Sequence, residues 1–147
     1  MSRWLSLTHE FVETFPRELV PGVLYLSIPF ATTAHSCCCG CGSRVIAPLS
    51  PVRWQMTFDG RTVSLSPSIG NWALKCRSHY WIRNNTVHWA GSFSQEQINR
   101  ARARDARDLE ALQRAEQGVS DSMSTDREPT RRWRRRWLGR SGKRGRE

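Results

Sequence analysis

Apolar and polar residues alternate along much of the first 93 positions, a pattern typical of strands that bury one face. The clearest example is a predicted hairpin over 53–65. In its first arm apolar residues occupy every second position from Trp54 to Phe58, the dipeptide Asp59-Gly60 supplies a two-residue turn, and the alternation resumes as far as Leu65. An antiparallel pair of strands is therefore expected here.

Short β-prone runs bounded by turn residues predict further strands on both sides of this hairpin. Pro21-Gly22 precedes the first of them, Asn84-Asn85 joins the last two, and a second set of turn residues interrupts the pattern at 67–71. Residues 1–18 are expected to form a short strand or an irregular lead-in. The core is predicted to be mainly β and antiparallel, with short connections and with strands at 23–28, 45–47, 78–82 and 86–89.

The pattern changes to that of a helix at Ser94. Ser94 and Gln97 form a capping box, and no Gly or Pro follows until Gly118. The apolar positions of this segment form only a thin stripe, so we expect a largely solvated helix over 94–117 that rests one edge on the β domain. The chain beyond is polar and charged, and we expect a disordered basic tail over 118–147.

The chain of 147 residues has room for one modest domain and a tail. Residues 1–93 hold eight Lys or Arg against four Asp or Glu, 94–128 hold six against eight, and 129–147 hold nine against one, which leaves +4, −2 and +8. The net charge of +10 therefore comes mainly from the tail and does not indicate a nucleic-acid-binding fold. Nucleic acid is expected only as a partner of the tail, where Trp residues lie among arginines.

The first 20 residues mix apolar and charged side chains and contain no uninterrupted apolar run. Neither a secretory signal nor a membrane span is therefore predicted, and we expect a cytoplasmic protein. In a reducing compartment a tight group of cysteines is more often bound to metal than joined by disulfides.

Four of the five cysteines lie within the segment His35-Ser-Cys-Cys-Cys-Gly-Cys-Gly42, and the fifth, Cys76, stands three residues before His79. Clustered thiols with a histidine at each end, joined by glycine bends, suit a tetrahedral Zn²⁺. We therefore predict zinc as the cofactor of this chain.

The choice of ligands follows in part from the direction of the side chains. Neighbouring side chains of an extended segment point to opposite sides, so Cys37, Cys39 and Cys41 can converge while Cys38 points away. The favoured ligands are Cys39, Cys41, Cys76 and one of His35 or Cys37. The sequence leaves open whether the zinc is structural or catalytic, since a catalytic zinc needs an unfilled position.

A serine on a sharp turn is the second candidate for chemistry. Ser68 stands between Pro67 and Gly70, a setting that can expose its hydroxyl beside backbone N–H groups, and His79 can serve as its general base if the two meet. Spacing alone favours a simpler interpretation, in which Ser68 is a turn residue and His79 is another metal ligand.

Four motifs that are specific in combination lie within about residues 10–108: His35-x-Cys37-x-Cys39-Gly40-Cys41-Gly42, Pro48-Leu49-Ser50-Pro51-x-x-Trp54, Ser64-Leu65-x-Pro67-Ser68-Ile69-Gly70-Asn71-Trp72 and Cys76-x-Ser78-His79-Tyr80-Trp81-Ile82. Through them the chain resembles the bacterial domain of unknown function 6527, a family encoded in operons for ubiquitin-like conjugation. The resemblance implies a peptidase that acts on a ubiquitin-like protein with a Ser-His dyad. It also implies E1-like and E2-like proteins of the same operon as partners, and a role in antiphage defence.

On this resemblance Ser68 is the nucleophile and His79 the general base, while Asn71 orients the site or helps to stabilise an oxyanion. Lys75 departs from the family's pattern, in which a proline is expected, and the basic tail lies outside the resemblance. The alternatives are Ser64 or Ser78 as nucleophile and His35 as base.

Together these observations predict a small zinc-stabilised β domain over 1–93, the C-terminal helix packed on it, and the tail. The expected function is a serine peptidase that processes or removes a ubiquitin-like protein, with a structural zinc that fixes the strand bearing His79. One alternative is a non-enzymatic zinc module that binds a protein or nucleic acid. The other is a zinc hydrolase in which His35, Cys41 and His79 hold the metal.

Overall fold

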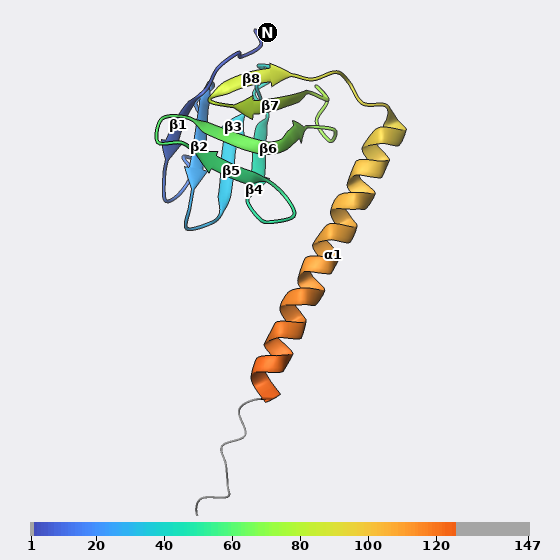
Figure 1. Cartoon of the computed structure of the whole chain (residues 1–147). Coiled ribbons are helices and arrows are strands. Elements are labelled where there is room, and N and C mark those ends of the chain that lie inside the picture. Colours follow the sequence, from blue (N-terminus) through green and yellow to red (C-terminus); the bar gives the residue numbers. More distant parts are fainter. Residues whose placement is uncertain (1, 126–147) are drawn as a thin grey trace, which may run out of the picture. The chain divides into compact units, whose positions relative to one another are not determined.

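The computed structural model describes residues 2–125, and within them eight strands form two four-stranded sheets followed by one helix (Figure 1). The first sheet contains, in spatial order, β1 (Thr8–Phe11), β2 (Val23–Ser27), β3 (Thr32–Ser36) and β4 (Arg44–Pro48). The second contains β5 (Gln55–Phe58), β6 (Val63–Gly70), β7 (His79–Arg83) and β8 (Thr86–Trp89). The helix α1 spans Gln95–Thr125.

The predicted mainly β domain with one C-terminal helix is confirmed, with one exception to its antiparallel pairing. β1 pairs with β2 in parallel, whereas the other pairs of neighbouring strands are antiparallel. The chain before β1 is held at the other sheet, because the Leu7 N–H donates to the Asn85 carbonyl at 2.7 Å and the Val87 N–H donates to the Leu5 carbonyl at 2.8 Å. It then enters the first sheet beside the start of β2 and runs in the same direction.

Two strands differ from the sequence prediction. β3 had no predicted counterpart, because four of its five residues are buried and it lacks the alternation of a half-buried strand. β6 continues to Gly70, although a turn was expected at 67–71. Its pairing with β7 shifts between Leu65 and Ile69. This bulge accommodates Pro67, which has no N–H for the ladder, and it re-aims the neighbouring Ser68.

Both sheets contribute to one hydrophobic core. Leu24 and Leu26 of β2 and Leu65 of β6 are almost completely buried in it, as are Tyr80 and Ile82 of β7. The first two cysteines of the cluster, which follow β3, belong to the same core. The cysteine segment therefore starts from a rigid position.

The helix begins as predicted and ends later. Ser94 and Gln97 form the capping box reciprocally, with the Ser94 N–H donating to Gln97 Oε1 at 2.8 Å and the Gln97 N–H donating to Ser94 Oγ at 3.3 Å. Ile98 is fully buried, and Gly118 lies inside the helix instead of beyond its end. Residues 1–110 form one compact unit and the rest of α1 belongs to a second. The remainder of the predicted tail, 126–147, lies outside the described residues.

In the described part of the chain, no helix is both long enough and apolar enough to cross a membrane.

Candidate active site and metal centre

Four cysteine sulfurs from two distant segments meet at one point. The Sγ atoms of Cys37, Cys39, Cys41 and Cys76 all lie within 4.8 Å of one another. Cys37 Sγ is 3.4 Å from Cys39 Sγ and 3.8 Å from Cys76 Sγ. The first three follow β3, in a knuckle whose glycines Gly40 and Gly42 have positive φ angles of 83° and 74°. Cys76 comes from the loop between β6 and β7.

The donor set fits a Zn²⁺ ion. Four sulfurs at about 2.3 Å from a tetrahedral zinc lie about 3.8 Å apart, which is close to the separations found here. Burial raises the pKa of the Cys37 and Cys39 thiols, whereas hydrogen bonds to the Ser43 hydroxyl and backbone lower the pKa of Cys41 to about 6. Four thiol ligands leave no open position, as in structural zinc sites.

The structure distinguishes between the two candidates for the fourth ligand. Cys37 lies in the sulfur group, whereas the buried His35 ring lies apart from it, with Nε2 2.8 Å from the Tyr80 hydroxyl. Burial lowers the pKa of His35 to about 4, so its imidazole is neutral at neutral pH. Cys38 points away into the core, as the alternation of side chains predicted, and burial raises its pKa to about 12.

Two polar side chains, Asn71 and Ser78, connect the sulfur group to β7. Asn71 Nδ2 donates to Ser78 Oγ at 2.9 Å, and Ser78 Oγ is 3.1 Å from Cys37 Sγ. The Ser78 hydroxyl accepts from Asn71 and has one proton of its own, which it can donate to a Cys37 thiolate when a metal is bound. Asn71 Nδ2 also reaches the Tyr80 hydroxyl at 3.3 Å. In the described residues no hydrogen bond joins the Asn71 side chain to Ser68 or His79; its amide instead contacts Ser78, Tyr80 and Cys37 Sγ.

The predicted nucleophile and base lie in contact. His79 begins β7 opposite Gly70, and its Nε2 is 2.9 Å from Ser68 Oγ on the bulge of β6. His79 Nδ1 is 3.0 Å from the Gly91 carbonyl oxygen, which can only accept a hydrogen bond. Nδ1 therefore carries the proton and Nε2 accepts from the Ser68 hydroxyl. This is the arrangement of a nucleophile, a base and a group that orients the base.

The alternative residues are placed elsewhere. Ser64 exchanges hydrogen bonds with Asn84 at the exposed end of the second sheet. Ser78 adjoins the cysteines, and His35 adjoins Tyr80. His35, Cys41 and His79 do not converge, so the predicted zinc hydrolase with these three ligands has no counterpart in the described residues.

Aromatic rings surround His79, which is only 4% exposed. Its ring centroid lies 4.5 Å from that of Phe93, 5.0 Å from Trp72 and 5.5 Å from Trp81. Trp72 and Phe93 stack on each other at 5.2 Å. Sequence reasoning missed Phe93 and the Gly91 carbonyl and gave Trp72 no role of its own in the site. The place of Trp72 at the end of the serine motif was the available signal.

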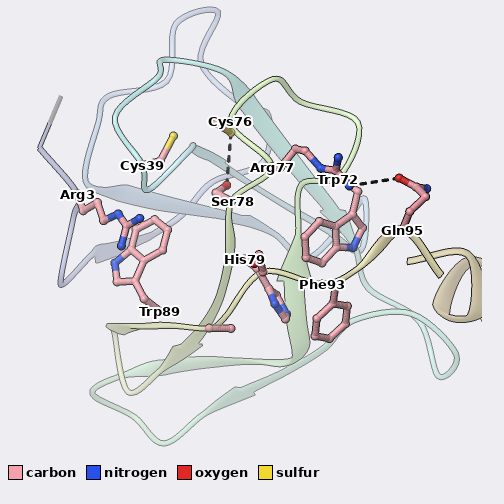
Figure 2. A pocket seen from close by; sticks show the side chains of 12 residues that line it. Arg3, Cys39, Trp72, Cys76, Arg77, Ser78, His79, Trp89, Phe93 and Gln95 are labelled. Carbon is pink, nitrogen blue, oxygen red and sulfur yellow. Dashed lines mark hydrogen bonds between the residues drawn. The ribbon is translucent and has the colours of Figure 1, made fainter. Parts of the chain in front are cut away.

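Two cavities meet at these rings. The larger, of about 530 Å³, is lined by His79 and by Cys39 and Cys76 (Figure 2). The smaller, of about 330 Å³, is lined by Ser68 and His79. Trp72 and Phe93 line both. His79 therefore borders both cavities, and Ser68 borders the smaller one.

A family model described as "bacterial ubiquitination-like system serine protease (BubE)" matches residues 11–90, more than half of the chain. The chain belongs to the BubE family. The matched span contains the four clustered cysteines, Ser68 and His79, and it agrees with the resemblance found in the sequence. Searches of curated proteins and of solved structures found no match.

The site of this BubE member extends beyond the matched span. The Gly91 carbonyl and the Phe93 ring, both in contact with His79, lie just after residue 90. The segment between β8 and α1 therefore belongs to the wall of the site.

Proposed function

We propose that this protein is a serine peptidase that processes or removes a ubiquitin-like protein in a bacterial ubiquitination-like pathway. The observation that carries the proposal is the contact between Ser68 Oγ and His79 Nε2 at 2.9 Å, with Nδ1 held by the Gly91 carbonyl. Membership of a serine protease family supports the reaction class. The partners are then the ubiquitin-like substrate and the E1-like and E2-like proteins of such a system, and the setting is cytoplasmic antiphage defence.

The reaction follows from this geometry. His79 Nε2 accepts the Ser68 proton as Oγ attacks the carbonyl at the C-terminal tail of the ubiquitin-like protein. When the tetrahedral intermediate collapses, the imidazolium returns that proton to the leaving amine and the C–N bond breaks. Water, activated by the same imidazole, then hydrolyses the acyl-enzyme. The rings of Trp72 and Phe93 shield the imidazole from water and hold its plane.

The metal has a structural role in this proposal. Cys37, Cys39, Cys41 and Cys76 would hold Zn²⁺, which when bound supplies a fixed crosslink between the knuckle and the loop before β7. Asn71 and Ser78 orient the same loop through their hydrogen bonds to each other and to the cluster. His79, three residues after Cys76, is thereby held against Ser68.

Cleavage of a precursor ubiquitin-like protein by the purified full chain tests the proposal. We expect Ser68→Ala and His79→Ala to lower kcat/KM by about 10³-fold or more, since the two groups act as a unit. Ser64→Ala serves as the matched control, because that hydroxyl lies at the far end of β6. If Ser68→Ala cleaves as fast as the unaltered protein, the assignment is wrong. Binding of a partner without cleavage would favour the non-enzymatic zinc module.

A further inference from the structure

The larger cavity beside His79 has two arginines and no acidic side chain in its wall, and the negative charge that cysteine thiolates would carry around a bound Zn²⁺ is confined to its Cys39 and Cys76 end. Arg3 and Arg77 contribute to its wall, and none of the twelve residues that line it is Asp or Glu. Figure 2 shows Cys39 and Cys76 at one end and the rings of His79 and Phe93 toward the other. A cavity of about 530 Å³ has room for two or three residues of a peptide.

The two arginines are held by other groups but lack carboxylate partners. The Arg3 guanidinium stacks over Trp89, 4.5 Å from the ring centroid, and Trp4 fixes the adjacent backbone by donating to the Cys38 carbonyl at 2.8 Å. Arg77 Nη2 donates to Gln95 Oε1 at 3.3 Å. Within residues 2–125 neither arginine forms an ion pair with an acidic side chain. Both guanidinium groups can therefore bind an anion in the cavity.

The direction of the proposed reaction decides which part of the substrate enters this cavity. His79 lines both cavities, whereas Ser68 lines only the smaller one. The acyl carbon bonds to Ser68 Oγ, and His79 protonates the leaving amine. The acylated tail therefore lies on the side of Ser68, and the leaving segment lies on the side of His79 that faces the larger cavity.

We propose that the larger cavity is the subsite for the leaving segment, and that Arg3 and Arg77 bind a carboxylate carried by that segment. The carboxylate is either an acidic side chain or the free carboxyl terminus of a short C-terminal extension. This inference rests on the proposed peptidase function and specifies its substrate. Arg3 and Arg77 are then specificity-determining residues that contact the substrate away from the reacting atoms.

Two measurements on the full chain test the subsite. The first is cleavage of quenched fluorescent peptides in which the tail of the ubiquitin-like protein is followed by Ala-Ala-Asp, Ala-Ala-Asn or Ala-Ala-Lys, each with a free or an amidated carboxyl terminus. The second is binding of the labelled tripeptides themselves, by fluorescence anisotropy. We expect kcat/KM and affinity to be roughly tenfold higher with a carboxylate, and this preference to shrink as salt is raised. Comparison of the acid and amide forms separates the side-chain source from the terminal source.

Arginine variants connect the preference to the cavity. Arg77→Gln and Arg3→Gln should each reduce the ratio of acidic to neutral kcat/KM, and the double variant should bring it to about one. Arg83→Gln is the matched control, since Arg83 also stacks on a tryptophan, Trp81, but lines neither cavity. It removes the same charge and should leave the ratio unchanged. Non-specific attraction to the basic residues 129–147 is common to all variants.

The outcomes separate this inference from the proposed function. If Ser68 cleaves all peptides with no carboxylate preference, the carboxylate-binding role of the cavity is refuted and the peptidase function stands. If the acidic tripeptides bind in an arginine-dependent manner but no peptide is cleaved, the peptidase function is refuted and the carboxylate-binding role stands. A preference that Arg83→Gln abolishes as fully as Arg77→Gln would also overturn the subsite.

Discussion

Gly70 determines where Trp72 can lie beside the candidate active site. It ends β6 two residues after Ser68, and the Trp72 indole packs against its backbone. A Cβ added to Gly70 would lie 2.3 Å from Trp72 Nε1, 2.5 Å from Cε2 and 2.8 Å from Cζ2. We predict that Gly70→Ala displaces the indole and lowers both activity and stability.

The size of the effect follows from these distances. Ordinary contact begins near 3.4 Å, so the indole has to move by about 1 Å. The indole cannot move independently, because it stacks on Phe93 and contacts the His79 ring. Overpacking of this kind costs about 1–3 kcal/mol of unfolding free energy. A misplacement of about 1 Å near the reacting groups costs up to about 10²-fold in rate, so we expect kcat/KM to fall by about 10- to 10²-fold.

Precursor cleavage and urea unfolding measure the two effects on the same preparations. Gly118→Ala is the matched control, because an added Cβ there meets nothing within 4 Å and the residue lies in α1, outside the walls of both cavities. The double variant Gly70→Ala/Trp72→Ala should lose no more stability than Trp72→Ala alone, since the clashing group is gone. Activity and stability of Gly70→Ala equal to those of the unaltered chain would refute the reasoning.

Two further predictions concern the metal site and the hairpin. The Cys76→Ala variant should lose its zinc and unfold at a lower urea concentration, whereas Cys38→Ala should keep one zinc per chain because its sulfur lies outside the group. Mass spectrometry of the metal content compares the two variants. Full chelation should unfold the domain, and a folded, inactive apo form would instead indicate a hydrolytic zinc. Asp59 accepts hydrogen bonds from the Thr62 N–H, the Arg61 N–H and the Thr62 hydroxyl, which lower its pKa to about 2. The stability that this carboxylate contributes is therefore present above the unfolded pKa of about 4 and lost as the pH falls through the folded value. The difference in urea midpoint between the unaltered chain and Asp59→Asn should be constant from about pH 7 to 5 and narrow below 4, and a difference that widens on acidification would contradict this.

The metal site was largely predictable because its ligands are close in sequence. Side-chain alternation alone separated Cys38 from its three neighbours, and the structure places those three sulfurs with Cys76. Side-chain alternation could not decide whether His35 or Cys37 is the fourth ligand. That choice depends on Tyr80, which lies far away in the sequence and takes His35 as its hydrogen-bond partner.

The serine and histidine were harder to predict, because their contact depends on long-range register. Proline and glycine around Ser68 indicate a turn when read locally, whereas pairing with β7 extends β6 through Pro67 and sets Gly70 opposite His79. Only the family resemblance raised this pair above the simpler interpretation. The Gly91 carbonyl is a backbone group, and no pattern of side chains indicates it.

Cys76, a candidate metal ligand, lies only three residues before His79, the candidate general base. In the loop between β6 and β7, the thiol that joins the sulfur group lies near the C-terminal end, just before the imidazole that begins β7. Without a crosslink, an eight-residue loop over 71–78 would let the imidazole drift from Ser68, and misplacement of about 1 Å is costly. A fixed Cys76 removes that freedom, while Asn71 and Ser78 hold the loop between them. In the proposed peptidase the four thiols would need no open coordination position, because zinc would serve only to fix the position of His79.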